Sequence, residues 1–345
     1  MHSPVHDISR RDAIRILGAG AALGAISGRL AAAGAPHPAA PSRQRKAIVR
    51  TILEDVAPER LSGTTLIHEH LSSSAAFTDD VGLIADEVKA CAQDGVSCIV
   101  DAGTDGLGRK IDALRTIATR SGMLIVACGG LHAKDDYPAD ALTKTADQIA
   151  DDLVEKARRE RWGAIGEMGT STAVPMDPIE RKGLEAAAKA HLRTGLSIIT
   201  HVSSGCAQCA LDQVDLFERA GVDLQHVVIG HLNDIKDQPA AVPIAIGKRG
   251  AYLGFDHSGK PDDPRADEYP RTLLAVLDAG LEDRICLSSD FYAEKYLRKS
   301  GGPGIDMILT TIVPRLKRLG VSDAILHRIL VENPRRVLTF TPMSA

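Results

Sequence analysis

From residue 64 onward, short apolar runs alternate with longer amphipathic segments. Each run is apolar throughout rather than at every second position, as in strands buried on both faces of a parallel sheet. The intervening segments have the 3.6-residue apolar spacing of helices, and several end at a glycine, such as Gly95 or Gly195. The predicted strands are 64–68, 96–101, 123–128, 164–167, 197–201, 226–231, 251–255 and 284–290.

Eight successive strand–helix units predict an α/β protein with the TIM-barrel fold, and a doubly wound open sheet is the alternative. A further helical pattern at residues 323–337 follows the eighth unit, and we expect it to pack on the outside or the end of the barrel. A single barrel domain is therefore expected over residues 41–345.

The first forty residues have a different character. Arg10 and Arg11 precede a weakly apolar run that is followed by three alanines and several prolines. This order is typical of a twin-arginine export signal with a cleavage site and a linker, and an amphipathic terminal helix is the alternative. The run is too short for a stable membrane anchor. Residues 1–40 are thus predicted to take the protein, through the twin-arginine export machinery, to the periplasm or outside the cell.

Composition excludes some functions and leaves one anomaly. The chain is 44% apolar and 25% charged, as globular proteins are, and its net charge of −4 does not suit nucleic-acid binding. It has twelve histidines, but five phenylalanines, five tyrosines and one tryptophan. Packing does not explain this excess of histidine, so we expect a chemical role for several of them.

Residues that can bind metals stand at the ends of the predicted strands. His68 and His70 are two positions apart, so both can face the barrel axis while Glu69 turns outward. Four more strand ends carry Glu167, His201, His231 and Asp290. These ends meet at one face of a TIM barrel, where imidazole and carboxylate groups suit zinc, manganese, cobalt or iron. A site for two divalent cations, with zinc favoured, is therefore predicted.

The other histidines divide into two groups. His257 follows the seventh strand and should face the same mouth of the barrel. The remaining ones in the barrel domain are expected to be ordinary loop, helix or strand residues: His132, His191, His226 and His327.

The cysteines give weaker signals. The thiols at 98, 128 and 286 lie within apolar runs and are expected to be buried. Cys206 and Cys209 form one C-x-x-C motif, which is weak support for a zinc site, and a disulfide in an oxidising compartment is the alternative.

The strand-end residues belong to short motifs at 65–71, 166–170, 199–201, 228–231 and 288–290, followed by a Gly-Gly-Pro-Gly segment at 301–304 and a closing segment at 329–334. In this order, over residues 46–340, they resemble the phosphotriesterase-like family of the amidohydrolase superfamily. The resemblance implies a TIM barrel with a binuclear metal centre, often dimeric, that hydrolyses esters, lactones or phosphotriesters.

The resemblance also implies a role for each ligand. The two histidines of the first strand and Asp290 would hold the more buried cation, and His201 and His231 the more exposed one. Glu167 would bridge the two cations, at a position where well-studied members carry a carboxylated lysine and a subset of the family carries glutamate.

A mechanism follows from this resemblance. A water between the two cations would lose a proton near neutral pH and attack a carbonyl or phosphoryl centre. Asp290 would accept the proton, and His257 together with Asp234 would pass it to solvent.

The substrate is the least determined part. Loops after the seventh and eighth strands shape the pocket in this fold, and their aromatic and charged residues suit a polar or anionic substrate, although ordinary packing and solvation are the alternative. The candidates are Phe255, Asp256, Lys260, Phe291 and Tyr292. A lactone or carboxylic ester is favoured because natural phosphotriesters are scarce. The alternatives are a phosphotriesterase or phosphodiesterase and a non-catalytic metal-dependent binding protein, which the complete ligand set disfavours.

Overall fold

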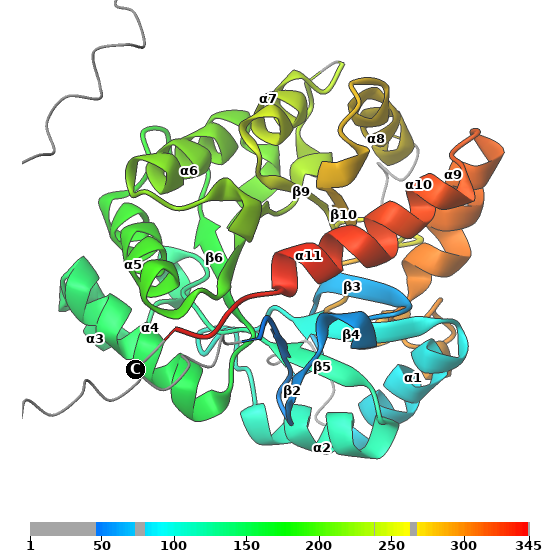
Figure 1. Cartoon of the computed structure of the whole chain (residues 1–345), viewed down its shortest axis with the longest axis horizontal. Coiled ribbons are helices and arrows are strands. Elements are labelled where there is room, and N and C mark those ends of the chain that lie inside the picture. Colours follow the sequence, from blue (N-terminus) through cyan, green and yellow to red (C-terminus); the bar gives the residue numbers. More distant parts are fainter. Residues whose placement is uncertain (1–45, 73–79, 238, 263–267, 344–345) are drawn as a thin grey trace, which may run out of the picture. The chain divides into compact units, whose positions relative to one another are not determined.

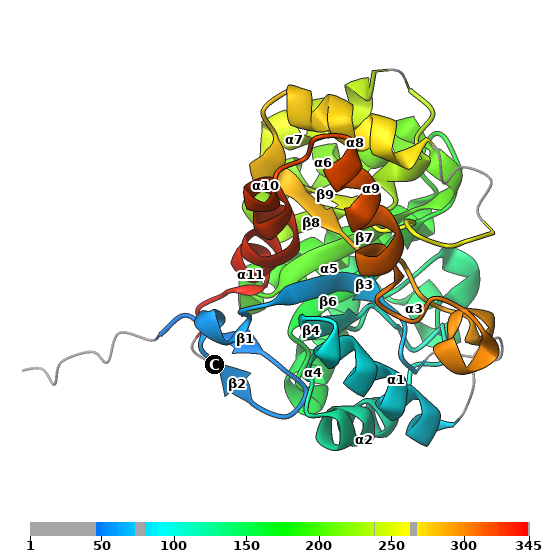
Figure 2. The same ribbon diagram turned by 90° about the vertical axis from the view of Figure 1, so that its right-hand side faces the viewer.

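The centre of the molecule is a ring of parallel strands surrounded by helices (Figures 1 and 2). The computed structural model describes residues 46–72, 80–237, 239–262 and 268–343. The predicted export signal and linker at residues 1–40 lie outside these ranges. Among the described residues, no helix is both long and apolar enough to cross a membrane.

Eight parallel strands form two sheets that join into a barrel. One sheet has the order β3 (Thr64–Glu69), β4 (Val96–Asp101) and β5 (Leu124–Ala127); the other has β10 (Ile285–Leu287), β9 (Tyr252–Phe255), β8 (Val227–Ile229), β7 (Ser197–Val202) and β6 (Ala164–Thr170). At one seam the Gly166 N–H donates to the Gly129 carbonyl over 3.1 Å, and at the other the Asp290 N–H donates to the His68 carbonyl over 3.1 Å. These bonds close the ring, so the predicted TIM barrel is confirmed over the open sheet.

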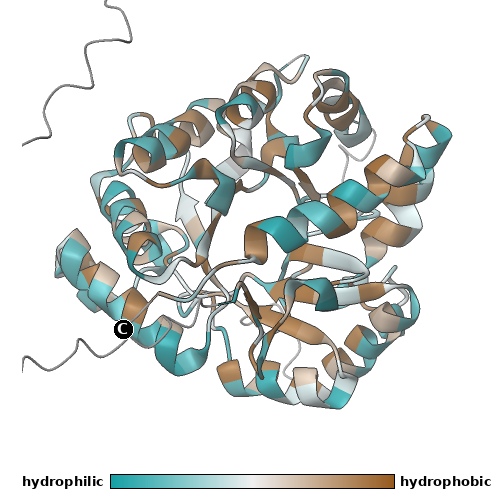
Figure 3. Cartoon of the chain, in the orientation of Figure 1, coloured by the Kyte–Doolittle hydropathy of each residue, from teal (hydrophilic) through white to brown (hydrophobic). Residues whose placement is uncertain are grey.

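Helices follow the strands in turn and cover the outside of the barrel. They are α1 (Val81–Gln93), α2 (Ile111–Ser121), α3 (Ala139–Thr143), α4 (Ala146–Glu160), α5 (Pro178–Thr194), α6 (Ala207–Arg219), α7 (Ala241–Arg249), α8 (Tyr269–Asp278) and α9 (Val313–Arg318). Their apolar faces turn toward the strands and their polar faces away (Figure 3). The sequence sets several helix ends: Thr145 and Gln148 form a capping box at the start of α4, and Gly195 ends α5 with a φ of +76°.

The core has two layers, one inside the barrel and one between the strands and the helices. The inner layer consists mainly of small aliphatic side chains, such as Ile67, Val100 and Val228. The predicted burial of the thiols is confirmed, since Cys98, Cys128 and Cys286 are 0% exposed and belong to this layer. The low aromatic content of the chain therefore reflects a barrel interior packed with aliphatic groups.

Both ends of the described chain close the bottom of the barrel. The strands β1 (Val49–Arg50) and β2 (Asp55–Val56) form a hairpin, and Ile48 pairs with Phe340. The predicted helix at 323–337 is one continuous helical stretch made of α10 (Asp323–His327), a π-helical turn (Arg328–Glu332) and α11 (Asn333–Leu338), which lies near the centre of Figure 1. Val337 and Leu338 join the inner core, so this helix packs on the end of the barrel.

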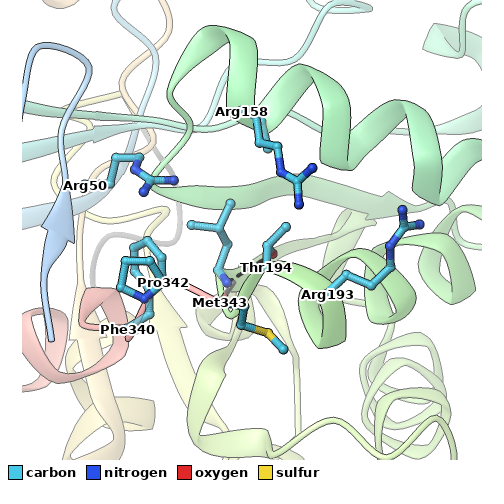
Figure 4. A pocket seen from close by; sticks show the side chains of 9 residues that line it. Arg50, Arg158, Arg193, Thr194, Phe340, Pro342 and Met343 are labelled. Carbon is cyan, nitrogen blue, oxygen red and sulfur yellow. Dashed lines mark hydrogen bonds between the residues drawn. The ribbon is translucent and has the colours of Figure 1, made fainter. Parts of the chain in front are cut away.

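A pocket of about 130 Å³ lies where β1, the last turns of α4 and α5, and the C-terminal segment meet (Figure 4). Arg50, Arg158 and Arg193 surround it together with Phe340. Its lining includes none of the predicted site residues, which stand at the opposite ends of the strands.

Candidate metal centre

The six predicted metal ligands converge on one space at the C-terminal ends of the strands. His68 belongs to β3, and His70 directly follows it. The others come from β6, β7 and the residues after β8 and β10: Glu167, His201, His231 and Asp290. Five of the six are nearly inaccessible to solvent, and His201 is partly exposed.

The first cluster consists of His68, His70 and Asp290. Nε2 of His70 lies 3.1 Å from Oδ1 of Asp290, and Nε2 of His68 lies 3.8 Å from the same oxygen. Oε2 of Glu167 is 3.5 Å from Nε2 of His70. Two imidazole nitrogens and two carboxylates thus face one point.

The second cluster consists of His201 and His231 around the other oxygen of Glu167. Oε1 of Glu167 is 2.6 Å from Nδ1 of His201 and 3.3 Å from Nε2 of His231, and these nitrogens are 2.8 Å apart. Nε2 of His68 is 3.5 Å from the same oxygen and lies between the two clusters. Glu167 therefore presents one oxygen to each cluster, as a bridging ligand must.

The donor set fits a pair of divalent cations. Nε2 of His68 is buried and makes no hydrogen bond within the described part of the chain, although two carboxylates lie within 4 Å of it. An unpartnered buried polar atom costs about 1–3 kcal/mol, and coordination of a cation would remove that cost. Histidine nitrogens and carboxylate oxygens are the ligands that zinc and similar metals take in proteins.

The charges of the ligands also suit cations. Burial acts to raise the pKa of Glu167, but the charge of His68 and the hydrogen bond with His201 outweigh it and hold that pKa well below its usual range. Burial lowers the pKa of His201 to about 4, which leaves this ring neutral. Burial acts to lower the pKa of His68 as well, yet the carboxylates of Glu167 and Asp256 outweigh it and raise that pKa well above its usual value. The proton on His68 supplies positive charge where a metal ion would otherwise supply it. A bound cation would displace this proton.

Asp256 lies behind the ligands rather than at the substrate pocket. It is 0% exposed, and its Oδ1 accepts hydrogen bonds from the backbone N–H of His231 (2.7 Å) and from Nδ1 of the same ring (2.8 Å). Its Oδ2 is 3.2 Å from Nδ1 of His68. Asp256 therefore orients the ring of His231, whose Nε2 faces the centre, and lies beside Nδ1 of His68, as carboxylates behind ligating histidines do.

Two of the aromatic residues predicted to contact substrate are also buried. Phe255 is 1% exposed and Phe291 is 0% exposed, and both belong to the hydrophobic core between strands and helices. Contact of these side chains and of Asp256 with substrate stays a prediction.

Glu69 points away from the barrel axis, as the strand alternation predicts, but it is completely buried. It accepts hydrogen bonds from the Ser288 hydroxyl (2.7 Å), the Ser289 N–H (3.0 Å) and the Phe291 N–H (2.6 Å). These bonds hold the loop that carries Asp290 with a φ of +47°, a backbone conformation that residues other than glycine rarely adopt.

We expect Glu69→Ala to lower the free energy of unfolding by about 2–4 kcal/mol, because several buried donors lose their acceptor at once. The variant should also bind less metal, since Asp290 loses its support. Glu69→Gln keeps the shape and one oxygen and should lose less. Thermal unfolding with metal analysis measures both effects, and Glu59→Ala, at an exposed glutamate, is the matched control. A Glu69→Ala protein with wild-type stability and metal content would contradict this role.

Asp290, His257 and Asp234, the residues of the predicted proton pathway, are joined in a row by hydrogen bonds. Nε2 of His257 is 2.8 Å from Oδ2 of Asp290, and its Nδ1 is 2.7 Å from Oδ2 of Asp234. The ring also stacks on His231, with centroids 3.9 Å apart. Burial acts to lower the pKa of His257, but the hydrogen bonds to Asp234 and Asp290 outweigh it and raise the pKa to about 9. The imidazole thus connects a ligand carboxylate to a second carboxylate.

Two of the predicted substrate residues lie beside this line. Lys260 is 7% exposed, with Nζ 3.3 Å from Oδ2 of Asp290 and 4.4 Å from the centre of the Tyr292 ring. Tyr292 is 43% exposed. A nearly buried ammonium group thus lies between Asp290 and an exposed aromatic ring.

His132, which was expected to be an ordinary loop residue, faces the same centre. Its Nε2 is 3.9 Å from Oε1 of Glu167, and its ring centroid is 4.4 Å from that of His201. The signal that points to it is its place in the loop after β5, on the side of the barrel where active sites are built. His191 and His226, in contrast, pack against each other with centroids 5.6 Å apart.

The C-x-x-C motif stands at the start of α6, close after His201. The structure joins Cys206 and Cys209 in a disulfide with their Cα atoms 5.2 Å apart. The motif therefore forms a short covalent loop there rather than part of the metal centre.

Comparison with known proteins connects this geometry to a family. Residues 48–338 match the profile of the phosphotriesterase family. The phosphotriesterase homology protein of Escherichia coli is 32% identical over 291 residues, covering 79% of this chain and 97% of that protein. The N-acetyltaurine hydrolase of Mus musculus is 28% identical over 347 residues, covering 85% of this chain and 98% of that protein.

Solved structures show the same architecture. A resiniferatoxin-binding protein from Rhodobacter sphaeroides has a TM-score of 0.78 at 30% identity, covering 84% of this chain and 94% of that one. The E. coli phosphotriesterase homology protein, solved with phosphate in its active site, has a TM-score of 0.75 at 30% identity and covers 80% and 98%. A lactonase from Listeria monocytogenes, with a TM-score of 0.78 at 24% identity over 85% and 99%, shares the fold.

Proposed function

This chain belongs to the phosphotriesterase family of hydrolases, and from that premise we propose that it is a metal-dependent hydrolase of a carboxylic ester or a lactone. The observation that supports this most is Glu167, whose two oxygens each face a separate cluster of histidine nitrogens. Such a pair of clusters is the donor set of a binuclear hydrolase, in which a carboxylate connects the two positions.

Each ligand has a place in this proposal. His68, His70 and Asp290 would hold the buried cation, and His201 and His231 the other, with the glutamate of β6 between them. When bound, the two cations would polarise the oxygen of the scissile group and lower the pKa of a water molecule. The metal remains a choice among zinc, manganese, cobalt and iron, with zinc favoured by the imidazole content.

The proton of the attacking water is assigned to Asp290. Its Oδ2 lies 2.8 Å from Nε2 of His257, so a neutral His257 that carries its proton on Nδ1 would accept the proton at Nε2 and pass the Nδ1 proton to Asp234. Because His257 is held between two carboxylates, its ring remains in the orientation that this transfer requires. Part of the His257 side chain is exposed, which connects this proton pathway to solvent.

An amide is the second kind of acyl substrate that this site could hydrolyse. The mouse relative is named for the hydrolysis of N-acetyltaurine, an amide with a sulfonate end. Lys260, a nearly buried cation beside Asp290, offers a partner for an anionic group at one end of the substrate. Hydrolysis of an N-acyl amide with an anionic end is therefore the second candidate function.

Lys260→Met should separate these substrates by charge. We expect its KM for an anionic ester or amide to rise by about 10–100-fold, the value of one charged hydrogen bond of about 1.5–3 kcal/mol. KM for a neutral lactone should change little. Lys295→Met removes an exposed lysine from the following loop and is the matched control. Equal losses for charged and neutral substrates would contradict the assignment.

A substrate panel tests the proposed function itself. Metal-free protein is loaded with zinc, manganese or cobalt and assayed on γ- and δ-lactones, aryl esters, N-acyl amino sulfonates and aryl phosphotriesters. The proposal expects the highest kcat/KM on an ester or lactone. Faster turnover of the amides would favour the second candidate, and faster turnover of the phosphotriesters would favour a phosphotriesterase. Two bound metals without turnover of any would favour a binding protein.

Two expectations from the sequence stay predictions. Export through the twin-arginine machinery depends on residues 1–40, which lie outside the described ranges. The homodimer implied by the family resemblance concerns a second copy of the chain.

A further inference from the structure

We propose that His132 is a further ligand of the more exposed cation, so that three histidine nitrogens and Glu167 hold that ion. This inference rests on the binuclear centre of the proposed function and changes the ligand set of one of its two positions.

The first support is the distance between donor atoms. One donor atom each from His132, Glu167 and His201 lies within 4.8 Å of the others, the same span that encloses His68, His70 and Asp290. The rings of His132 and His201 are in edge-to-face contact, with an interplanar angle of 71°. The donor atoms of His132, Glu167 and His201 thus lie within the same distance limit as those of the predicted inner ligands.

The second support is the orientation of the ring. Nδ1 of His132 lies 2.7 Å from Oδ2 of Asp136, and since a carboxylate accepts hydrogen bonds, Nδ1 carries the proton. Nε2 then carries the lone pair and lies 3.9 Å from Oε1 of Glu167. Asp256 holds the ring of His231 in the same way, through Nδ1 at 2.8 Å. A histidine with its distal nitrogen on a carboxylate is oriented as metal ligands usually are.

The third support is the fixed position of the loop. The Gly169 N–H donates to the Leu131 carbonyl over 3.1 Å, so the loop lies directly on β6, the strand that carries Glu167. A Cβ atom on Gly169 would clash with the His132 carbonyl, and one on Gly106 would clash with the Asp136 carbonyl. The backbone at His132 and the backbone at Asp136 therefore each pack closely against a glycine. A larger residue at either glycine would not leave room for this contact.

On this assignment the ligand chemistry of the two positions differs. The inner position has two histidine nitrogens and two carboxylates, whereas the outer would have the nitrogens of His201 and His231, the shared Glu167 and, in addition, Nε2 of His132. The His132 side chain is 18% exposed, which fits a ligand on the solvent side of the pair. The nitrogen-rich position suits zinc or cobalt better than manganese.

Titration of the metal-free full chain with Co²⁺ tests this assignment without relying on activity. Wild type should bind two ions, and the visible absorption of Co²⁺ reports the ligands of each. His132→Ala should bind the first ion as wild type does and the second about 100-fold more weakly or worse, with a changed spectrum of the second ion. Asp136→Asn should weaken the second ion by about 10-fold, as loss of a supporting carboxylate does.

Two further variants make the result decisive. His132→Gln keeps a polar side chain of similar length and should reproduce the loss, and His327→Ala removes an exposed histidine and should bind both ions normally. Two tight sites with a wild-type spectrum in both His132 variants would overturn the inference while leaving the proposed function intact. A wild-type chain that bound fewer than two ions would overturn both.

Discussion

Glu167→Ala is expected to lose at least about 1,000-fold in kcat/KM, equivalent to about 4 kcal/mol of transition-state stabilisation. The reason is that both metal clusters share this one side chain. Its Oε1 is 2.6 Å from Nδ1 of His201, and its Oε2 is 3.5 Å from Nε2 of His70. Removing the carboxylate leaves each position with fewer ligands and leaves more positive charge than negative charge in a buried space.

The Glu167 series separates charge from shape. Glu167→Gln keeps the volume but removes the charge, so it should lose nearly as much metal as Glu167→Ala. Glu87→Gln, at a buried glutamate of α1 paired with Arg298, is the control and should keep both metals. Metal content by mass spectrometry and steady-state kinetics are the measurements. An alanine variant with two metals and wild-type activity would show that the bridging assignment is wrong.

Asp290→Asn is expected to lower kcat by about 1,000-fold or more, with a much smaller change in KM. Oδ1 of Asp290 is 3.1 Å from Nε2 of His70, and Oδ2 is 2.8 Å from Nε2 of His257. Asparagine keeps the size and one acceptor oxygen, but it neither carries the negative charge nor accepts a proton. The same residue thus loses its function as ligand and as proton acceptor in one substitution.

Comparison with His257→Asn assigns the two effects. That variant interrupts the proton line but leaves the metal clusters complete, so it should keep two metals and lose less in kcat than Asp290→Asn. Asp283→Asn, at an exposed aspartate before β10, is the control. If Asp290→Asn kept the wild-type kcat, Asp290 would be neither the proton acceptor nor an essential ligand.

The barrel and the meeting of the candidate ligands at one of its ends were predictable because of where polar groups interrupt apolar runs. A strand buried on both faces is a continuous apolar segment, and a histidine or carboxylate at its end is conspicuous, as with His201 after Ser197–Thr200. The TIM-barrel fold then brings the ends of separate strands together. Alternation along a strand likewise predicted that Glu69 turns from the axis.

The features that the sequence did not indicate depend on how the loops fold back over the strand ends. His132 stands five residues beyond β5, and the path of its loop onto β6 is set by close backbone contact that no periodicity records. Asp256 occupies a position that a substrate residue could also occupy, and its role became clear from its hydrogen bonds to His231. The burial of Glu69 by the loop after β10 is of the same kind.

The most direct test of a binuclear, metal-dependent hydrolase is the number of divalent cations per chain measured against hydrolysis. The protein is freed of metal with a chelator and titrated with zinc, and bound metal and ester or lactone turnover are followed on the same samples. The account predicts negligible turnover without metal, and full turnover when two ions per chain are bound. Undiminished turnover by the metal-free protein would contradict it.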